Sequence, residues 1–228
     1  MENPPDKPAG DLVAAVARGL VGMVPGAGGL LVELGNQLNP LEKRKQIWAQ
    51  RVADAITEIE SKLSILPSAL WRNEAFVSFA WEATFIALKN HRTEKLRALQ
   101  AALVSMATCP QPDEDMAFQH LRYVDELTVT HLKLLACFAQ NAEKYVGINA
   151  VSAIMKKTES FLGEQINRGS FRSFLADLER AFMIRCIDFE EMKEDGPSPD
   201  YLVGESSAPG GLVVTPRGNA FLAFIRAA

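Results

Sequence analysis

The sequence predicts a mainly α protein. Apolar residues recur at helical spacings of three and four from Leu41 to Phe182, and the two short β-branched runs both lie near the C-terminus. The chain has 228 residues, of which 48% are hydrophobic and 23% are charged. That length and composition are sufficient for one globular domain or two small ones without stabilising disulfides.

The N-terminal 38 residues divide into two parts of different composition. Residues 1–10 contain three prolines and no apolar run, which predicts a disordered lead and argues against a secretory signal. Residues 11–38 are almost uncharged but contain Pro25 and several glycines, which interrupt a continuous helix. We therefore expect a glycine-rich apolar helical hairpin, with short helices near 11–23 and 29–38.

Three interpretations of this hairpin are open. It packs on the rest of the protein, or it contacts a membrane or partner, or its turn binds phosphate. The Gly22-xxx-Gly26 spacing lets membrane helices approach closely, whereas the missing Lys and Ser/Thr after Gly29 argue against a phosphate loop. The candidate contact residues are Gly19, Gly22, Pro25, Gly26, Gly28 and Gly29.

Residues 39–108 are predicted to form a helical bundle. Asn39-Pro40 is a typical helix start, and the apolar stripe through Trp48, Val52, Ile56 and Ile59 predicts a helix of about seven turns. The basic run Lys43, Arg44 and Lys45 is either a solvated helix face or an anchor for anionic lipid headgroups.

The rest of this bundle continues to a turn at residues 109–112. Residues 75–88 are apolar on every side of a helix, which predicts a central position. Thr93 is expected to cap the next helix, with Leu96 and Leu99 on its buried side. The Cys109-Pro110-Gln111-Pro112 turn is the expected domain boundary.

Residues 113–228 show the element order of a winged-helix-like domain. Asp113, Thr128 and Ser170 mark helix starts, with a further helix expected over about 142–167. Strands are expected at 184–187 and 212–215, and Thr215-Pro216 starts the last helix. The apolar face of the helix from Ser170 is predicted to consist of Phe171, Phe174, Leu175, Leu178 and Phe182.

The charge distribution bears on the partner of this domain. The net charge is −4 overall, +3 over residues 41–107 and −5 over residues 108–228. The candidate nucleic-acid contacts are Arg168, Arg172, Arg180 and Arg217. The same region carries many carboxylates, which favours protein docking over DNA binding because phosphate neutralisation supplies much of the affinity for DNA.

Three stretches resemble a group of uncharacterised bacterial proteins. They are VPGAGGLLVELGNQLNPLEKRKQIW, NEAFVSFAWEATFIALKNHRTEKLRALQ and FQHLRYVDELTVTHLKLLACF. The similarity covers most of the chain from about Gly19 onward. It implies a helical front half with a winged-helix end in a cytoplasmic bacterial protein, and it implies no catalytic residues.

No local motif indicates catalysis, a metal site or a cofactor. The three histidines and three cysteines are scattered, without HExxH, CxxC or a Walker pattern. We expect a non-enzymatic bacterial interaction or regulatory protein, cytoplasmic or peripheral to the inner membrane, with a protein partner and with homo-oligomerisation open. The alternatives are a DNA-binding transcription regulator and a membrane protein anchored by residues 12–38.

Overall fold

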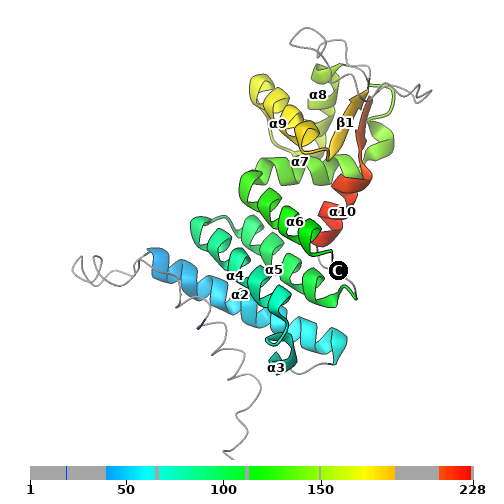
Figure 1. The fold of residues 1–228 in the computed structure, drawn as a ribbon. Coiled ribbons are helices and arrows are strands. Elements are labelled where there is room, and N and C mark those ends of the chain that lie inside the picture. Colours follow the sequence, from blue (N-terminus) through cyan, green and yellow to red (C-terminus); the bar gives the residue numbers. More distant parts are fainter. Residues whose placement is uncertain are drawn as a thin grey trace, which may run out of the picture. The chain divides into compact units, whose positions relative to one another are not determined.

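The computed structural model describes Gly19 and residues 40–64, 67–110, 113–148, 150–187 and 211–226. These residues are mainly helical, with one antiparallel sheet of two strands (Figure 1). The chain divides into two compact units. The first unit extends to Glu126 and also takes in the residues from Phe224 onward, and the second unit is Leu127–Ala223.

The first unit is a bundle of helices. Its helices are α2 (Pro40–Leu63), the short α3 (Pro67–Leu70), α4 (Glu74–Lys89), α5 (Thr93–Thr108) and α6 (Glu114–Glu126). Helix α2 packs on α4 and α5, and α6 packs on the same two helices. The core therefore lies around α4 and α5.

Helix α2 confirms the predicted start at Pro40 and the predicted stripe. Trp48, Val52, Ile56 and Ile59 are all buried. The Trp48 indole Nε1 donates to Thr84 Oγ1 at 3.0 Å, and this hydroxyl in turn donates to the Ala80 carbonyl. The buried polar atoms of the α2–α4 contact are thus paired, which avoids the cost of desolvating an unmet donor.

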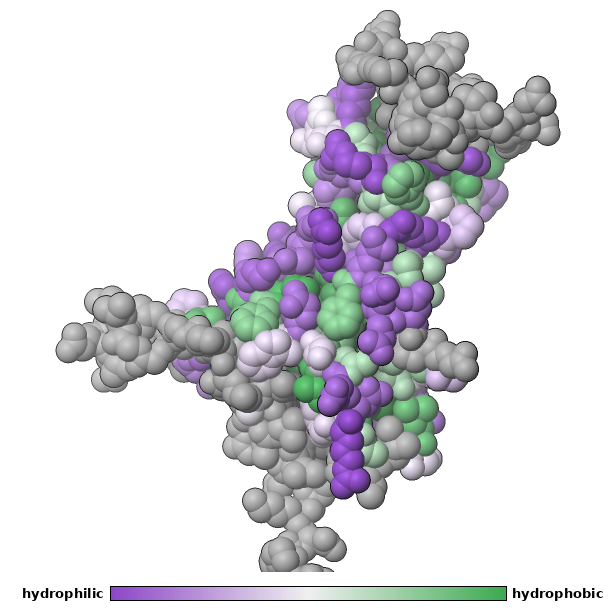
Figure 2. Space-filling view, viewed as in Figure 1, coloured by the Kyte–Doolittle hydropathy of each residue, from purple (hydrophilic) through white to green (hydrophobic). Residues whose placement is uncertain are grey.

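Helix α4 is less enclosed than its composition predicts. Asn73 caps it by accepting from the Phe76 backbone N–H at 3.1 Å, and Phe79 is fully buried. Trp81 and Phe85, however, are half-exposed and pack edge to face with ring centres 5.1 Å apart. Hydrophobic side chains accordingly reach the surface of the first unit over α4 (Figure 2).

The compact units divide one helix later than the Cys109–Pro112 turn. Helix α6 belongs to the first unit because its apolar face, including Leu121 and Val124, is buried there. Lys95 of α5 also donates from Nζ to the Asp125 carbonyl at 2.8 Å, and burial lowers the pKa of this amine. Thr93 is the first helical residue and not the cap, since Arg92 holds the cap position without a side-chain hydrogen bond.

The second unit contains three main helices and the small sheet. In chain order its elements are α7 (Val129–Gln140), the 3-10 turn η1 (Ala142–Lys144), α8 (Val151–Leu162), α9 (Arg168–Arg180), β1 (Ile184–Ile187), β2 (Gly211–Val214) and α10 (Pro216–Phe224). Strands β1 and β2 pair antiparallel, with Ile184 opposite Val214. Val146 makes a further antiparallel bridge to Gly211. Both predicted strands are confirmed.

Two local predictions in this unit are wrong. The helix expected over 142–167 is interrupted, because the chain turns through Gly147 at a φ of +76° and Val146 pairs with β2 instead. Phe182, expected on the buried face of α9, is 52% exposed at a φ of +55°. The residue lies past the end of the helix, where the chain turns into β1.

Thr215 joins the sheet to α10. Its hydroxyl accepts from the Gly218 backbone N–H at 3.1 Å and donates to the Phe182 carbonyl at 2.6 Å. The predicted cap at Thr215-Pro216 is therefore confirmed. Gly218 lies directly against the Met183 carbonyl, so that a Cβ at this position would overlap backbone atoms.

This close approach predicts a large cost for Gly218→Ala. Because the obstacle is backbone and not a flexible side chain, we expect the free energy of unfolding to fall by about 2 kcal/mol or more, typical of overpacking. Urea denaturation followed by circular dichroism measures the change. The control is Asn219→Ala, an exposed neighbour on the same helix, which should unfold like the wild type. Equal stability of the two variants would contradict the prediction.

Candidate functional site

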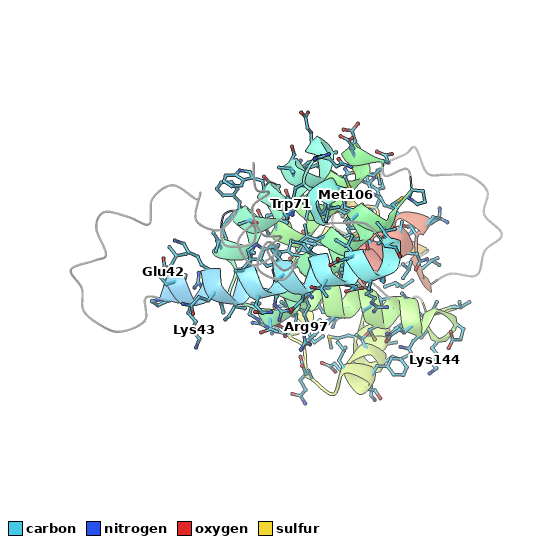
Figure 3. The ribbon with its side chains drawn as sticks, turned by 90° about the horizontal axis from the view of Figure 1, so that it is seen from below. Glu42, Lys43, Trp71, Arg97, Met106 and Lys144 are labelled. Carbon is cyan, nitrogen blue, oxygen red and sulfur yellow. The ribbon has the colours of Figure 1, made fainter. Side chains whose placement is uncertain are left out.

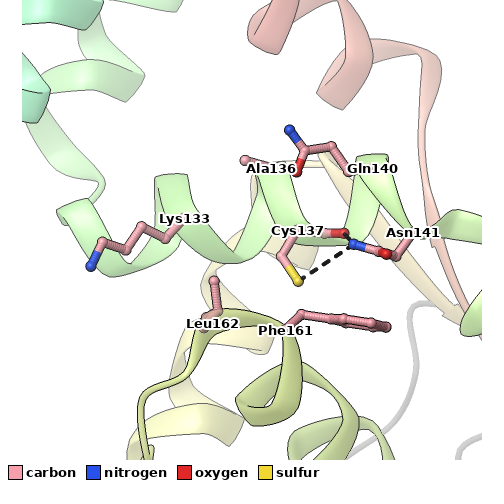
Figure 4. Close-up of a pocket in the computed structure, with 7 residues that line it drawn as sticks. All are labelled: Lys133, Ala136, Cys137, Gln140, Asn141, Phe161 and Leu162. Atoms are coloured by element: carbon pink, nitrogen blue, oxygen red, sulfur yellow. Dashed lines mark hydrogen bonds between the residues drawn. The ribbon is translucent and has the colours of Figure 1, made fainter.

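A hollow of about 330 Å³ lies between α7 and the C-terminal end of α8. It is lined by Lys133, Ala136, Cys137, Gln140, Asn141, Phe161 and Leu162. Figure 4 shows Cys137 of α7 facing Phe161 and Leu162 of α8, with Lys133 at one end and Asn141 at the other. All seven residues belong to the second unit, so the hollow is a property of that unit alone.

Helix α7 is fixed at its N-terminus by a capping box between Thr128 and His131. The His131 ring Nδ1 accepts from the Thr128 backbone N–H at 3.1 Å. The ring proton is therefore assigned to Nε2, which lies 3.4 Å from a carboxylate oxygen of Asp177 on α9. His131 is thus a buried capping residue that also joins α7 to α9.

Below the hollow, a buried chain of hydrogen bonds joins α7, Tyr145 and α8. Thr158 Oγ1 donates to the Ile154 carbonyl at 2.8 Å, so it accepts from the Tyr145 hydroxyl, 3.1 Å away. The Tyr145 oxygen then accepts from the Cys137 thiol at 3.4 Å. This order holds Cys137 as a thiol donor, and burial raises the pKa of the Tyr145 phenol, which stays protonated.

The rim of the hollow is partly apolar and partly charged. Phe161 is 39% exposed, and Lys144 Nζ lies 4.8 Å from its ring centre in a cation–π contact. Lys133 is held by Glu164 at 2.8 Å. Asn141 donates its amide to the Cys137 carbonyl at 3.0 Å.

These contacts define what the hollow can accept. The titratable groups that line it are the Lys133 amine, which is paired with Glu164, and the Cys137 thiol, which already donates a hydrogen bond to Tyr145. Its exposed surface is the ring of Phe161 beside aliphatic and amide groups. The arrangement is suited to hold an apolar side chain of a ligand and contains no pair of groups arranged for acid–base chemistry.

No motif in the sequence indicates this hollow directly. Its key residues, Tyr145 and Phe161, lie inside the stretch expected to be one helix. The spacing of Ile154, Thr158 and Phe161 places them on one face of α8. This spacing is the one pattern in the sequence that points to the surface of α8 beside the hollow. The junction at Tyr145 depends on contacts between segments that only the folded unit brings together.

The four arginines proposed as nucleic-acid contacts have different environments. Arg168 is exposed at the start of α9, and Arg172 is half-buried on the same helix. Arg180 pairs with Asp177 at 2.8 Å, so its charge is largely compensated. Arg217 is half-buried in the first turn of α10.

The basic run at the start of α2 is only partly free for a ligand. Arg44 donates to the Leu88 carbonyl at 3.4 Å, and Lys45 pairs with Glu42 at 2.9 Å, whereas Lys43 is exposed. Of the glycine-rich hairpin, only Gly19 is described, and its α-carbon faces open space. The other candidate contacts, Gly22, Pro25, Gly26, Gly28 and Gly29, lie outside the described residues.

Two kinds of feature are absent from the described ranges. Within them, no helix combines the length and the hydropathy needed to cross a bilayer. The same part of the chain contains no cluster of three histidine, cysteine or carboxylate side chains able to hold a metal ion. Comparison with protein-family models, with curated proteins and with solved structures finds no match for this chain.

The environments of the three cysteines predict different thiol reactivity. Cys109 is exposed, Cys137 is buried, and burial together with nearby Glu179 raises the pKa of Cys186. At pH 8 we expect iodoacetamide to modify Cys109 at least about tenfold faster than the other two, because the thiolate is the reactive form. Peptide mass spectrometry over time measures the rates, and unfolding in guanidinium should make them similar. Rapid modification of Cys137 in the native protein would contradict the hydrogen-bond order given above.

Proposed function

We infer that the protein is a non-enzymatic bacterial interaction protein whose second unit is a winged helix that docks a protein partner. The observation that carries this proposal is the hollow between α7 and α8, with half-exposed Phe161 on its rim. A half-exposed aromatic side chain beside a hollow of mixed polar and apolar lining is a typical feature of a protein-binding surface. The proposal places the protein in the cytoplasm.

The element order supports the winged-helix assignment. Helix α7 is followed by the Val146 bridge, then by α8 and α9, and then by the antiparallel pair β1 and β2. Helices α8 and α9 are separated by a short turn that begins at Gly163, as in a helix-turn-helix. In this assignment α9 takes the position of the recognition helix.

The charge of α9 favours a protein partner over DNA. A DNA-reading helix needs several cationic side chains free to approach phosphates. Here the Arg180 guanidinium is paired with Asp177, and the Glu179 carboxylate accepts from the Cys186 backbone N–H at 3.0 Å. Those two carboxylates keep negative charge on the helix that would enter the groove.

The chemistry of the hollow restricts the partner. Lys133 and Asn141 at its two ends are already engaged with Glu164 and with the Cys137 carbonyl. A ligand therefore gains mainly from burying apolar surface against Phe161 and Leu162. The proposed partner segment presents one aliphatic or aromatic side chain to this hollow.

Site-specific photo-crosslinking tests this proposal. Replacing Phe161 with benzoylphenylalanine in the native host should give one protein conjugate of defined mass, because that side chain borders the partner. Benzoylphenylalanine at Ser152, exposed on the opposite face of α8, is the matched control and should give none. Ala136→Leu fills part of the hollow and should reduce the conjugate at least about tenfold.

Two outcomes would reject the proposal. Equal conjugates from positions 161 and 152 would show that the hollow is not the binding surface. Saturable binding to duplex DNA with a steep salt dependence, lost in Arg168→Ala/Arg172→Ala, would instead assign the unit to DNA recognition.

A further inference from the structure

Three arginines from two helices of the first unit form a basic patch. Arg44 and Arg51 lie on α2, and exposed Arg97 lies on α5, which packs along α2. Seen from below, Arg97 lies beside the middle of α2 (Figure 3). Arg51 Nη1 donates to Gln100 Oε1 on α5 at 2.8 Å, which holds this guanidinium at the contact between the two helices. We call Arg44, Arg51 and Arg97 the α2–α5 patch.

The positive charge of this patch is incompletely balanced. Burial lowers the pKa of Arg51, and the like charge of the nearby Arg97 guanidinium lowers it further. The negative charge of Asp54 raises the pKa of Arg51 and so opposes this lowering. The Asp54 carboxylate, however, already accepts a hydrogen bond from the Gln50 amide at 2.8 Å. Within the described ranges, none of the three arginines forms an ion pair with a carboxylate.

One donor of the patch is also unmet. Arg51 Nε is buried and has no hydrogen-bond acceptor. A carboxylate that approaches the accessible part of the two guanidinium groups would relieve their mutual repulsion, whereas the buried Nε stays out of its reach. The favoured ligand is therefore an anionic chain with several carboxylates.

The chain itself supplies a segment with that chemistry. Residues 188–210 contain seven carboxylates and a single lysine, a net charge of −6. Each copy of the protein thus carries both a basic patch and an acidic segment. In a two-fold dimer the two patches would each meet an acidic segment, so two contacts form in one association event.

We propose that the α2–α5 patch binds the acidic segment 188–210 of a second copy of this chain. The contact is independent of the hollow in the second unit. Since it is electrostatic and at the surface, it weakens as salt rises. An anionic membrane is a different ligand for the same arginines, and the experiment below separates it from the acidic segment.

Charge reversal with mixing tests the proposal. Arg51→Glu/Arg97→Glu reverses the charge of the patch. Glu190→Lys/Glu191→Lys/Glu194→Lys reverses the charge of residues 190–194, the part of the segment proposed to meet the patch. By sedimentation velocity at low salt, each variant alone should show a dimer dissociation constant raised at least about tenfold over wild type. An equimolar mixture should restore dimers, because both contacts in the mixed dimer again join opposite charges. Arg72→Glu, an exposed charge change elsewhere in the first unit, should dimerise as wild type does.

Three results would overturn the proposal. The first is a wild-type protein that stays monomeric at low salt, and the second is a mixture that fails to restore dimers. The third is binding to vesicles rich in anionic lipid that is lost in the patch variant and kept in the segment variant, which would assign the patch to membranes. Arg97→Glu alone changes only an exposed side chain, so it keeps the test valid should Arg51→Glu perturb folding.

Discussion

The second unit depends on the burial of Tyr145. Its ring is fully buried, 5.2 Å from the ring centre of Phe138, and its hydroxyl joins Cys137 of α7 to Thr158 of α8. Its carbonyl lies against Gly211, where a Cβ would overlap it and where the φ of +133° disfavours other residues. One residue outside any regular helix or strand therefore sets the spacing of α7, α8 and β2. The hollow lies between these same two helices, and Cys137, which donates to Tyr145, is one of its lining residues.

The same geometry explains why the hollow suits binding better than catalysis. The hydrogen bonds run in one direction, from the Cys137 thiol through Tyr145 and Thr158 to a backbone carbonyl that has no proton to pass on. A nucleophilic cysteine needs a base or a positive charge beside it, and Cys137 donates its hydrogen bond to a phenol instead. The buried polar groups thus support the shape of the surface and leave recognition to Phe161 and its neighbours.

Sequence patterns predicted the parts of the fold that are determined locally. The α2 stripe, the caps at Asp113 and Thr128 and both strands depend on residues close in sequence, and all of them are present. The break at Gly147 and the exposure of Phe182 were missed, because both depend on how β2 returns to pair with distant residues. The hollow was missed for a similar reason, since its lining residues come from two helices whose packing only the folded unit determines. The glycine-rich hairpin and the winged-helix assignment remain predictions.

Charged residues can be counted from the sequence, but the count does not show where they lie in the fold. The positive excess over 41–107 and the acidic run after β1 can be counted from the sequence. Their meaning depends on placement, because most exposed charges are compensated by neighbours and contribute little. Arg51 and Arg97 are far apart in sequence, and only the packing of α2 on α5 brings their like charges together with a buried, unmet Nε. Two like charges repel, and on a flexible chain they would move apart. The packing of α2 on α5, which is fixed by the burial of apolar side chains, keeps these two guanidinium groups close together. Among the described residues no carboxylate forms an ion pair with the patch, and this is the reason for proposing an acidic ligand there.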